Sequence, residues 1–106
     1  MAKAEIESGQ CGFATVVIAS MNGKVCNLSI TSDCEGIQKL ASELAEVDPY
    51  REISFNQDAP LTFKMAAKHC LHAACPVPIG IIKAVEIEAG LGVPVDVIIK
   101  LSKASS

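Results

Sequence analysis

The chain has few aromatic residues: no Trp, one Tyr and three Phe among its 106 residues. Proteins that bind single-stranded nucleic acid stack the bases on aromatic side chains, so no such platform is expected here. Nine Lys and Arg stand against twelve Asp and Glu, and they form no basic run. A phosphate backbone attracts the opposite charge pattern. We therefore expect no nucleic acid partner.

The sequence also lacks the segments that address a chain to a membrane. No apolar run approaches the roughly 18 residues needed to span a bilayer, and the first 25 residues hold no uninterrupted apolar stretch behind a positive start. A Gly-rich phosphate loop and a Ser-centred nucleophile elbow are missing too, because Gly90-Leu91-Gly92 lacks the rest of a phosphate-binding fingerprint. We expect a cytoplasmic protein without a membrane partner, and an ordinary enzyme is not favoured.

What the chain has in excess is aliphatic residues. Half of its residues are hydrophobic, 20% are charged and the mean hydropathy is +0.37. This composition is typical of a folded chain, and the length suits a single domain over residues 1–106. We expect residues 1–8 and 103–106 to fray. So large an apolar share also favours a face that is hidden in a homodimer.

An N-terminal β-hairpin is the clearest local prediction. Two β-rich runs, residues 12–21 and 24–31, flank Asn22-Gly23, a pair that is typical of a type I′ turn. With these two residues as the turn, the register carried to the open end of the hairpin places Cys11 opposite Cys34. The predicted core face consists of Phe13, Thr15, Val17, Ala19, Cys26, Leu28, Ile30 and Ser32.

The remaining pattern predicts helices and two further strands. A capping box at Ser32-Asp33-Cys34-Glu35 marks the start of the first helix, and Pro76 and Pro78 suit the first turn of the third. The predicted elements are a helix over 33–47, a strand over 52–55, a helix over 61–73, a helix from about 76 to 89 and a strand over 95–101. The order ββαβααβ predicts an α/β (α+β) domain whose helices pack on one face of a mixed sheet.

The five cysteines carry most of the chemical interest. In a reducing compartment they are thiols, metal ligands or redox groups. Cys34 and Cys75 lie at predicted helix starts, which stabilise a thiolate. Cys11 is brought to Cys34 by the hairpin register, and His72 precedes Cys75 by three residues. Because three sulfurs and one nitrogen suit zinc or an iron–sulfur cluster, we expect a metal site formed by Cys11, Cys34, His72 and Cys75.

Three other residues are interpreted as structural. Cys26 faces the predicted core, and Cys70 lies on the apolar stripe of the helix over 61–73, where a small buried hydrophobe is the commoner role. His69 is interpreted as a structural histidine. No CxxC pair occurs, so the alternative that all five cysteines are small residues without function stays open.

Two resemblances bear on these residues. Cys75-Pro76-Val77-Pro78 resembles the Cys-Pro-x-Pro motif of TusA-like sulfur carriers, which implies that Cys75 carries a persulfide sulfur. The wider pattern resembles a family of uncharacterised bacterial and archaeal domains, which implies that its cysteines and histidine act as one set. That pattern consists of Cys11-Gly12-Phe13, Ser32-Asp33-Cys34 and His72-Ala73-Ala74-Cys75-Pro76-Val77-Pro78.

Three functions therefore stay open. The first is binding of a metal ion or an iron–sulfur cluster. The second is a sulfur-relay or thiol-redox protein in which Cys75 attacks or carries sulfur and Cys34 or Cys11 resolves it. The third is an interaction domain that forms a homodimer without chemistry. The first two imply a sulfur- or electron-transfer protein as partner.

Overall fold

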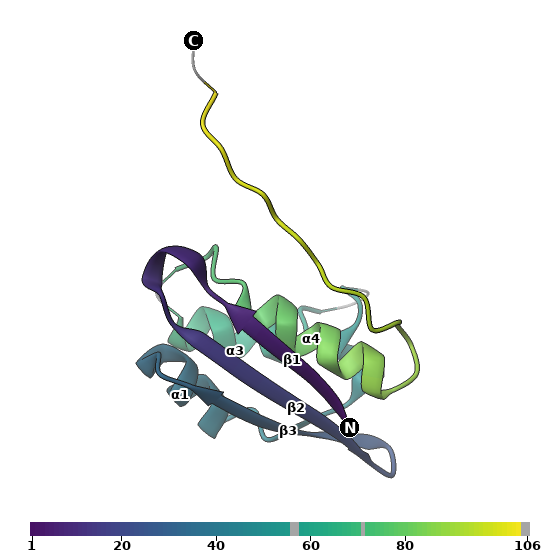
Figure 1. The fold of residues 1–106 in the computed structure, drawn as a ribbon. Coiled ribbons are helices and arrows are strands. Elements are labelled where there is room, and N and C mark those ends of the chain that lie inside the picture. Colours follow the sequence, from purple (N-terminus) through teal and green to yellow (C-terminus); the bar gives the residue numbers. More distant parts are fainter. Residues whose placement is uncertain (56–57, 71, 105–106) are drawn as a thin grey trace.

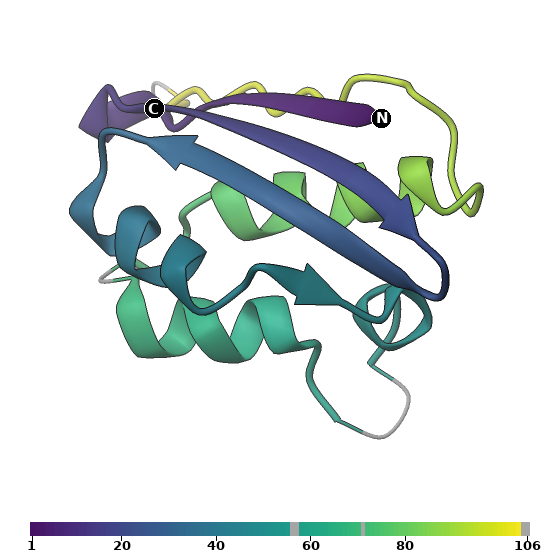
Figure 2. The same cartoon turned by 90° about the horizontal axis from the view of Figure 1, so that it is seen from below.

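The computed structural model describes residues 1–55, 58–70 and 72–104. It is a mixed α+β fold in which helices cover one face of a four-stranded sheet (Figures 1 and 2). The strands lie side by side in chain order: β1 (Ala2–Glu7), β2 (Ala14–Asn22), β3 (Val25–Ser32) and β4 (Glu46–Val47). The helices are α1 (Glu35–Ser42), α2 (Pro49–Glu52), α3 (Leu61–His69) and α4 (Val77–Glu88), and a 3₁₀ turn, η1 (Gly9–Cys11), joins β1 to β2. The predicted class is confirmed, but every strand pair is antiparallel, so the sheet is not mixed.

The hairpin between β2 and β3 is confirmed, with its turn one residue later than predicted. Asn22 pairs with Val25, which leaves Gly23 and Lys24 as the two turn residues. Gly23 has a φ of +66° and Lys24 does not have a positive φ. A type I′ turn needs positive φ at both positions, so the turn is of another type, with glycine first.

The later turn changes the partners along the hairpin but not the face that is buried. Thr15 pairs with Ser32, where the predicted register gave Ile30. Because side chains alternate with a period of two, a shift of two residues keeps the same side chains on the core face. The ladder ends at this Thr15–Ser32 pair, before Cys11 or Cys34 is reached. The strand pairing on which their predicted proximity rested is therefore wrong.

The first residues of the chain are ordered in a strand, contrary to the predicted fraying of residues 1–8. β1 pairs with β2 along its whole length, from Ala2 opposite Ala19 to Glu7 opposite Ala14. The strand alternates between inward small or apolar residues and outward charged ones, but alanine has a low strand preference, which weakens that signal. At the other end of the chain, residues 105–106 of the predicted frayed tail lie outside the described residues.

Three predicted elements differ from the structure in the middle of the chain. The helix predicted over 33–47 ends at Ser42, because Val47 pairs with Cys26 as part of β4. The strand predicted over 52–55 is wrong: Glu52 ends the short helix α2, whose start is capped by Asp48 accepting the Tyr50 amide (3.0 Å), and residues 53–55 belong to no strand. The helix predicted over 61–73 ends at His69, and Leu71, in its predicted last turn, lies outside the described residues.

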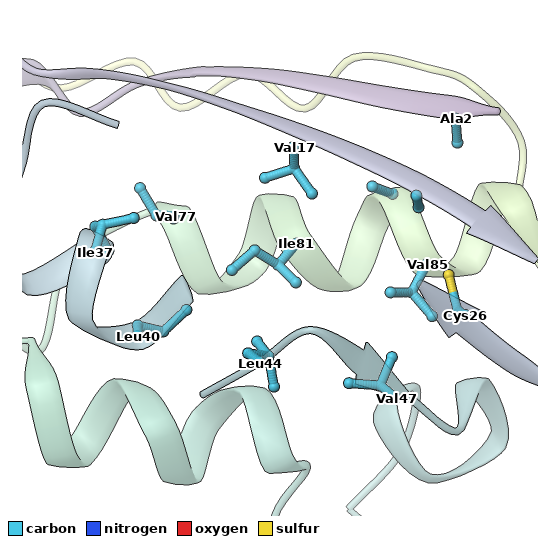
Figure 3. Packing of buried hydrophobic residues seen from close by; sticks show 12 residues of the cluster. Ala2, Val17, Cys26, Ile37, Leu40, Leu44, Val47, Val77, Ile81 and Val85 are labelled. Carbon is cyan, nitrogen blue, oxygen red and sulfur yellow. The ribbon is translucent and has the colours of Figure 1, made fainter. Parts of the chain in front are cut away.

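The core fills the space between the sheet and the helices (Figure 3). It is aliphatic except for one cysteine, as the scarcity of aromatic residues requires. Its buried members are Ala2, Val17, Ala19, Cys26, Ile37, Leu40, Leu44, Val47, Val77, Ile81, Ala84 and Val85. The longest helix, α4, has 12 residues, so no helix in the described ranges is long enough to cross a membrane.

The segment after α4 is extended and projects from the body of the molecule (Figure 1). The strand predicted over 95–101 is wrong: these residues form no strand in the structure, because no strand of the described sheet pairs with them.

Candidate functional site: a cluster of three cysteines

Three of the five cysteines lie at the ends of three helices. Cys34 is the N-cap of α1, Cys70 is the C-cap of α3, and Cys75 precedes α4 by two residues. Figure 2 shows the start of α1, the end of α3 and the start of α4 at the same end of the molecule. All three cysteines are half-buried and pack against the core, and their thiols are free.

The electrostatic surroundings of Cys70 show that the other two thiols are its neighbours. Burial raises the pKa of the Cys70 thiol from its ordinary value, and negative charge on Cys75 and on Cys34 raises this pKa further. The structure therefore brings together three thiols from separate elements.

A missing side chain lets two of these elements approach closely. Gly36 lies in the first turn of α1, and an ideal Cβ on this residue would stand 2.8 Å from the carbonyl oxygen of His69. The same Cβ would be 3.8 Å from the Cα of Cys70. Any residue other than glycine would thus push the end of α3 away from the start of α1, where Cys34 lies.

Short hydrogen bonds hold the backbone of Cys34 in place. The Thr15 hydroxyl donates to the Ser32 hydroxyl oxygen (2.8 Å), which also accepts the Cys34 amide (3.1 Å). The Gln38 side-chain amide donates to the Ser32 carbonyl (2.8 Å). Ser32, part of the predicted capping box, thus acts two residues before the N-cap position, which Cys34 takes.

Polar contacts also anchor the last turn of α3 on α1. Glu43 follows α1, accepts a hydrogen bond from the Lys68 ammonium (2.9 Å) and contacts Nε2 of His69. The bond with His69, and then that with Lys68, lowers the pKa of the Glu43 carboxyl. Because His69 is the residue before Cys70, this contact helps to fix the position of the cluster, in agreement with the structural role expected for His69.

Of the four residues predicted to form a metal site, two belong to this cluster. Cys34 and Cys75 do so, whereas Cys11 is exposed in η1 and His72 is exposed in the turn before α4. The His72 carbonyl accepts the Cys75 amide (3.3 Å). In residues 1–55, 58–70 and 72–104, no three His, Cys, Asp or Glu side chains are arranged to hold a metal ion.

Cys70 is the member of the cluster that the sequence did not indicate. Helical periodicity places it on the apolar stripe of α3, but α3 ends at His69 and Cys70 has an extended backbone. The one available signal is its spacing of five residues from Cys75, which itself precedes a proline-rich helix start. Cys26, by contrast, lies in the core as predicted, where burial raises its pKa and keeps it protonated.

Fold and site together define a small α+β protein with three neighbouring thiols at the meeting point of its helix ends. The chain belongs to a family of unknown function, DUF6951, whose model matches residues 2–101. No curated protein and no solved structure matches the chain. The family agrees with the expected kind of uncharacterised domain and includes the segment after α4 up to residue 101.

Proposed function

We propose that the protein carries out thiol–disulfide exchange at Cys70 and Cys75, with Cys34 as a third thiol beside them. The observation that supports this function is the placement of Cys70 at the end of α3 and of Cys75 just before α4, where Cys75 lies close enough to raise the pKa of the Cys70 thiol. Two neighbouring thiols, five residues apart in sequence, are candidates to form one disulfide in the folded state. A reducing compartment such as the cytoplasm keeps such thiols free between reactions.

The two thiols differ in a way that assigns their roles. Cys75 lies just before the start of α4, the positive end of the helix, and Cys70 lies at the negative, C-terminal end of α3. Burial raises the pKa of Cys70, so this thiol stays protonated at neutral pH. Cys75 is therefore the attacking thiol, and Cys70 resolves the intermediate.

The reaction needs a disulfide as co-reactant, supplied by a small molecule or by an electron-transfer protein. The Cys75 thiolate attacks one sulfur of that disulfide, forms a mixed disulfide and releases the first thiolate. Cys70 then loses its proton and attacks the Cys75 sulfur, which forms the Cys70–Cys75 disulfide and releases the second thiolate. Two electrons pass to the co-reactant, and the two thiol protons end on its two released sulfurs.

Oxidised glutathione is a suitable probe for this reaction, with peptide mapping by mass spectrometry as the readout. The wild type is expected to yield a Cys70–Cys75 disulfide, and Cys70→Ser is expected to trap glutathione on Cys75. Cys11→Ser is the matched control, since Cys11 is exposed and lies outside the cluster; it should leave the Cys70–Cys75 disulfide unchanged. Modification confined to Cys11, with the cluster still reduced, would contradict the proposal.

The sulfur-relay and metal hypotheses involve the same thiols, and both can be tested on the same purified protein. A persulfide donor would load Cys75 in the relay, as the resemblance to sulfur carriers implies. For zinc or an iron–sulfur cluster, the three sulfurs are chemically suitable donors. Stoichiometric metal in protein purified without oxygen, lost in both Cys34→Ser and Cys70→Ser, would replace thiol exchange by metal binding.

A further inference from the structure

The segment after α4 carries a run of exposed large apolar side chains. Residues 93–101, here named the C-terminal segment, contain six large aliphatic side chains whose exposed fractions run from 58% at Val97 to 89% at Leu101. Soluble monomers rarely leave so long an apolar stretch in water, and an extended apolar segment readily pairs with a sheet edge. The segment lies within the range matched by the family model.

The sheet offers one long free edge that such a segment fits. The strand order β1-β2-β3-β4 leaves β1, of six residues, at one edge and β4, of two residues, at the other. The outer backbone amides and carbonyls of an edge strand have no partner within the sheet. β1 can therefore accept a further strand along its whole length.

We propose that the C-terminal segment of each chain adds as a fifth strand to β1 of a second copy, so that two copies exchange their segments in a symmetric dimer. Each copy contributes one donor strand and one acceptor edge. In a two-fold symmetric exchange, each donor segment pairs with one acceptor edge, and no segment or β1 edge stays unpaired.

The alternation of the two strands supports this pairing. In β1, Ala2, Ala4 and Ile6 face the helices, and in the segment Val95, Val97 and Ile99 share one face. If the segment runs parallel to β1 with Val97 beside Ala4, these apolar side chains extend the core-facing layer. The remaining side chains then face solvent, as those of Lys3 and Glu7 do.

Charge supports the same register. In this parallel arrangement Asp96 lies beside Lys3, and Lys100 lies beside Glu7. An antiparallel register with Val97 beside Ile6, by contrast, places Asp96 beside Glu7 and Lys100 beside Lys3. Opposite charges on neighbouring strands are favourable and like charges are not.

The start of the segment directs it outward rather than onto its own sheet. The amides of Leu91 and Gly92 both donate to the Glu86 carbonyl (2.8 and 3.1 Å), and Gly90 has a φ of +75°. This cap ends α4 in a defined direction. The molecule consequently measures 53 Å along its longest axis and 28 Å along the other two, and the segment extends away from its own sheet (Figure 1).

Two neighbouring isoleucines provide a matched test, because they lie on opposite faces of the segment. Ile99→Lys puts a charge on the face that packs toward the core, whereas Ile98→Lys puts the same charge on the solvent face. By size-exclusion chromatography with light scattering, the full chain and Ile98→Lys should be dimers. Ile99→Lys should weaken association by at least about tenfold.

Amide hydrogen exchange in β1 adds a second readout. The outward-pointing β1 amides, which do not pair with β2, should be protected in the dimer and should lose protection in Ile99→Lys and in a chain that ends at residue 92. Equal effects of the two lysines, or a dimer that survives removal of residues 93–106, would overturn the proposal. A monomeric full chain would also overturn it: protected β1 amides would then indicate that the segment folds onto its own β1, and unprotected amides that its partner is another protein.

Discussion

Removal of the buried Glu52 carboxylate is expected to destabilise the fold strongly. Glu52 is 3% exposed, and its Oε1 accepts the Thr62 amide (2.9 Å) and the Thr62 hydroxyl (2.6 Å). Its Oε2 accepts the Leu61 amide (3.0 Å). The N-cap position of α3 is Pro60, whose side chain cannot accept a hydrogen bond, so Glu52 caps the helix from a distance. This buried acid is therefore a structural group.

The size of the effect follows from these three hydrogen bonds. Loss of a helix cap costs about 1–2 kcal/mol. In Glu52→Ala the hydroxyl of Thr62, which is fully buried, also loses its acceptor, at a cost of about 1–3 kcal/mol. Since the two effects share one carboxylate, we expect the free energy of unfolding to fall by about 2–4 kcal/mol in total.

Urea unfolding followed by circular dichroism measures this change. Glu7→Ala is the control, because Glu7 is exposed at the end of β1, and it should stay within about 0.5 kcal/mol of the wild type. In the Glu52→Ala background, Thr62→Val should cost little, since the hydroxyl has already lost its acceptor. A loss for Glu52→Ala no larger than that for Glu7→Ala would refute the capping role.

Two further predictions concern the contact between α1 and α3. Gly36→Ala should destabilise the protein by roughly 1–2 kcal/mol in urea unfolding, because the new Cβ overlaps the His69 carbonyl. This overlap outweighs the helix propensity gained by alanine. A gain in stability would show that α1 and α3 approach each other less closely at this point. Glu43→Gln should be less stable than the wild type near neutral pH, since the pKa of Glu43 is lowered by His69 and then by Lys68. A lowered folded pKa stabilises the protein above the ordinary value of 4.5, and this contribution is lost as pH falls through the lowered pKa. Urea midpoints of the two proteins should therefore converge in acid, and a difference that does not change with pH would contradict the reasoning.

The hairpin shows what periodicity can and cannot predict. Alternation identified both strands and the buried face, because these depend on which residues are even or odd along the strand. The register depends on whether Gly23 is the second turn residue, after Asn22, or the first, before Lys24. Both turns bury the same face, so the hydrophobic pattern does not distinguish them.

The end of α1 was mispredicted for a related reason. Leu40, Leu44 and Val47 have helical spacing, and all three are buried, but Val47 is buried as a strand residue paired with Cys26. The Leu28 amide donates to the Ala45 carbonyl (2.8 Å), so residues 45–47 pair with the edge of β3. The hydrogen bonds that favour a strand over a longer helix here are thus made with residues distant in sequence.

The thiol cluster combines a predictable part with an unpredictable one. Cys34 and Cys75 were placed correctly at helix starts, because a polar cap and a proline pair are local signals. Cys70 could be assigned only after the end of α3 was known to lie against the start of α1, which depends on the absence of a side chain at Gly36. A glycine in the first turn of a helix has no local reason to be there, since it weakens the helix. Gly36, two residues after Cys34, is thus the sequence feature that most directly indicates the contact between the start of α1 and the end of α3. Gly36→Ala should therefore slow the oxidation of the three-thiol cluster as well as lower the stability of the fold.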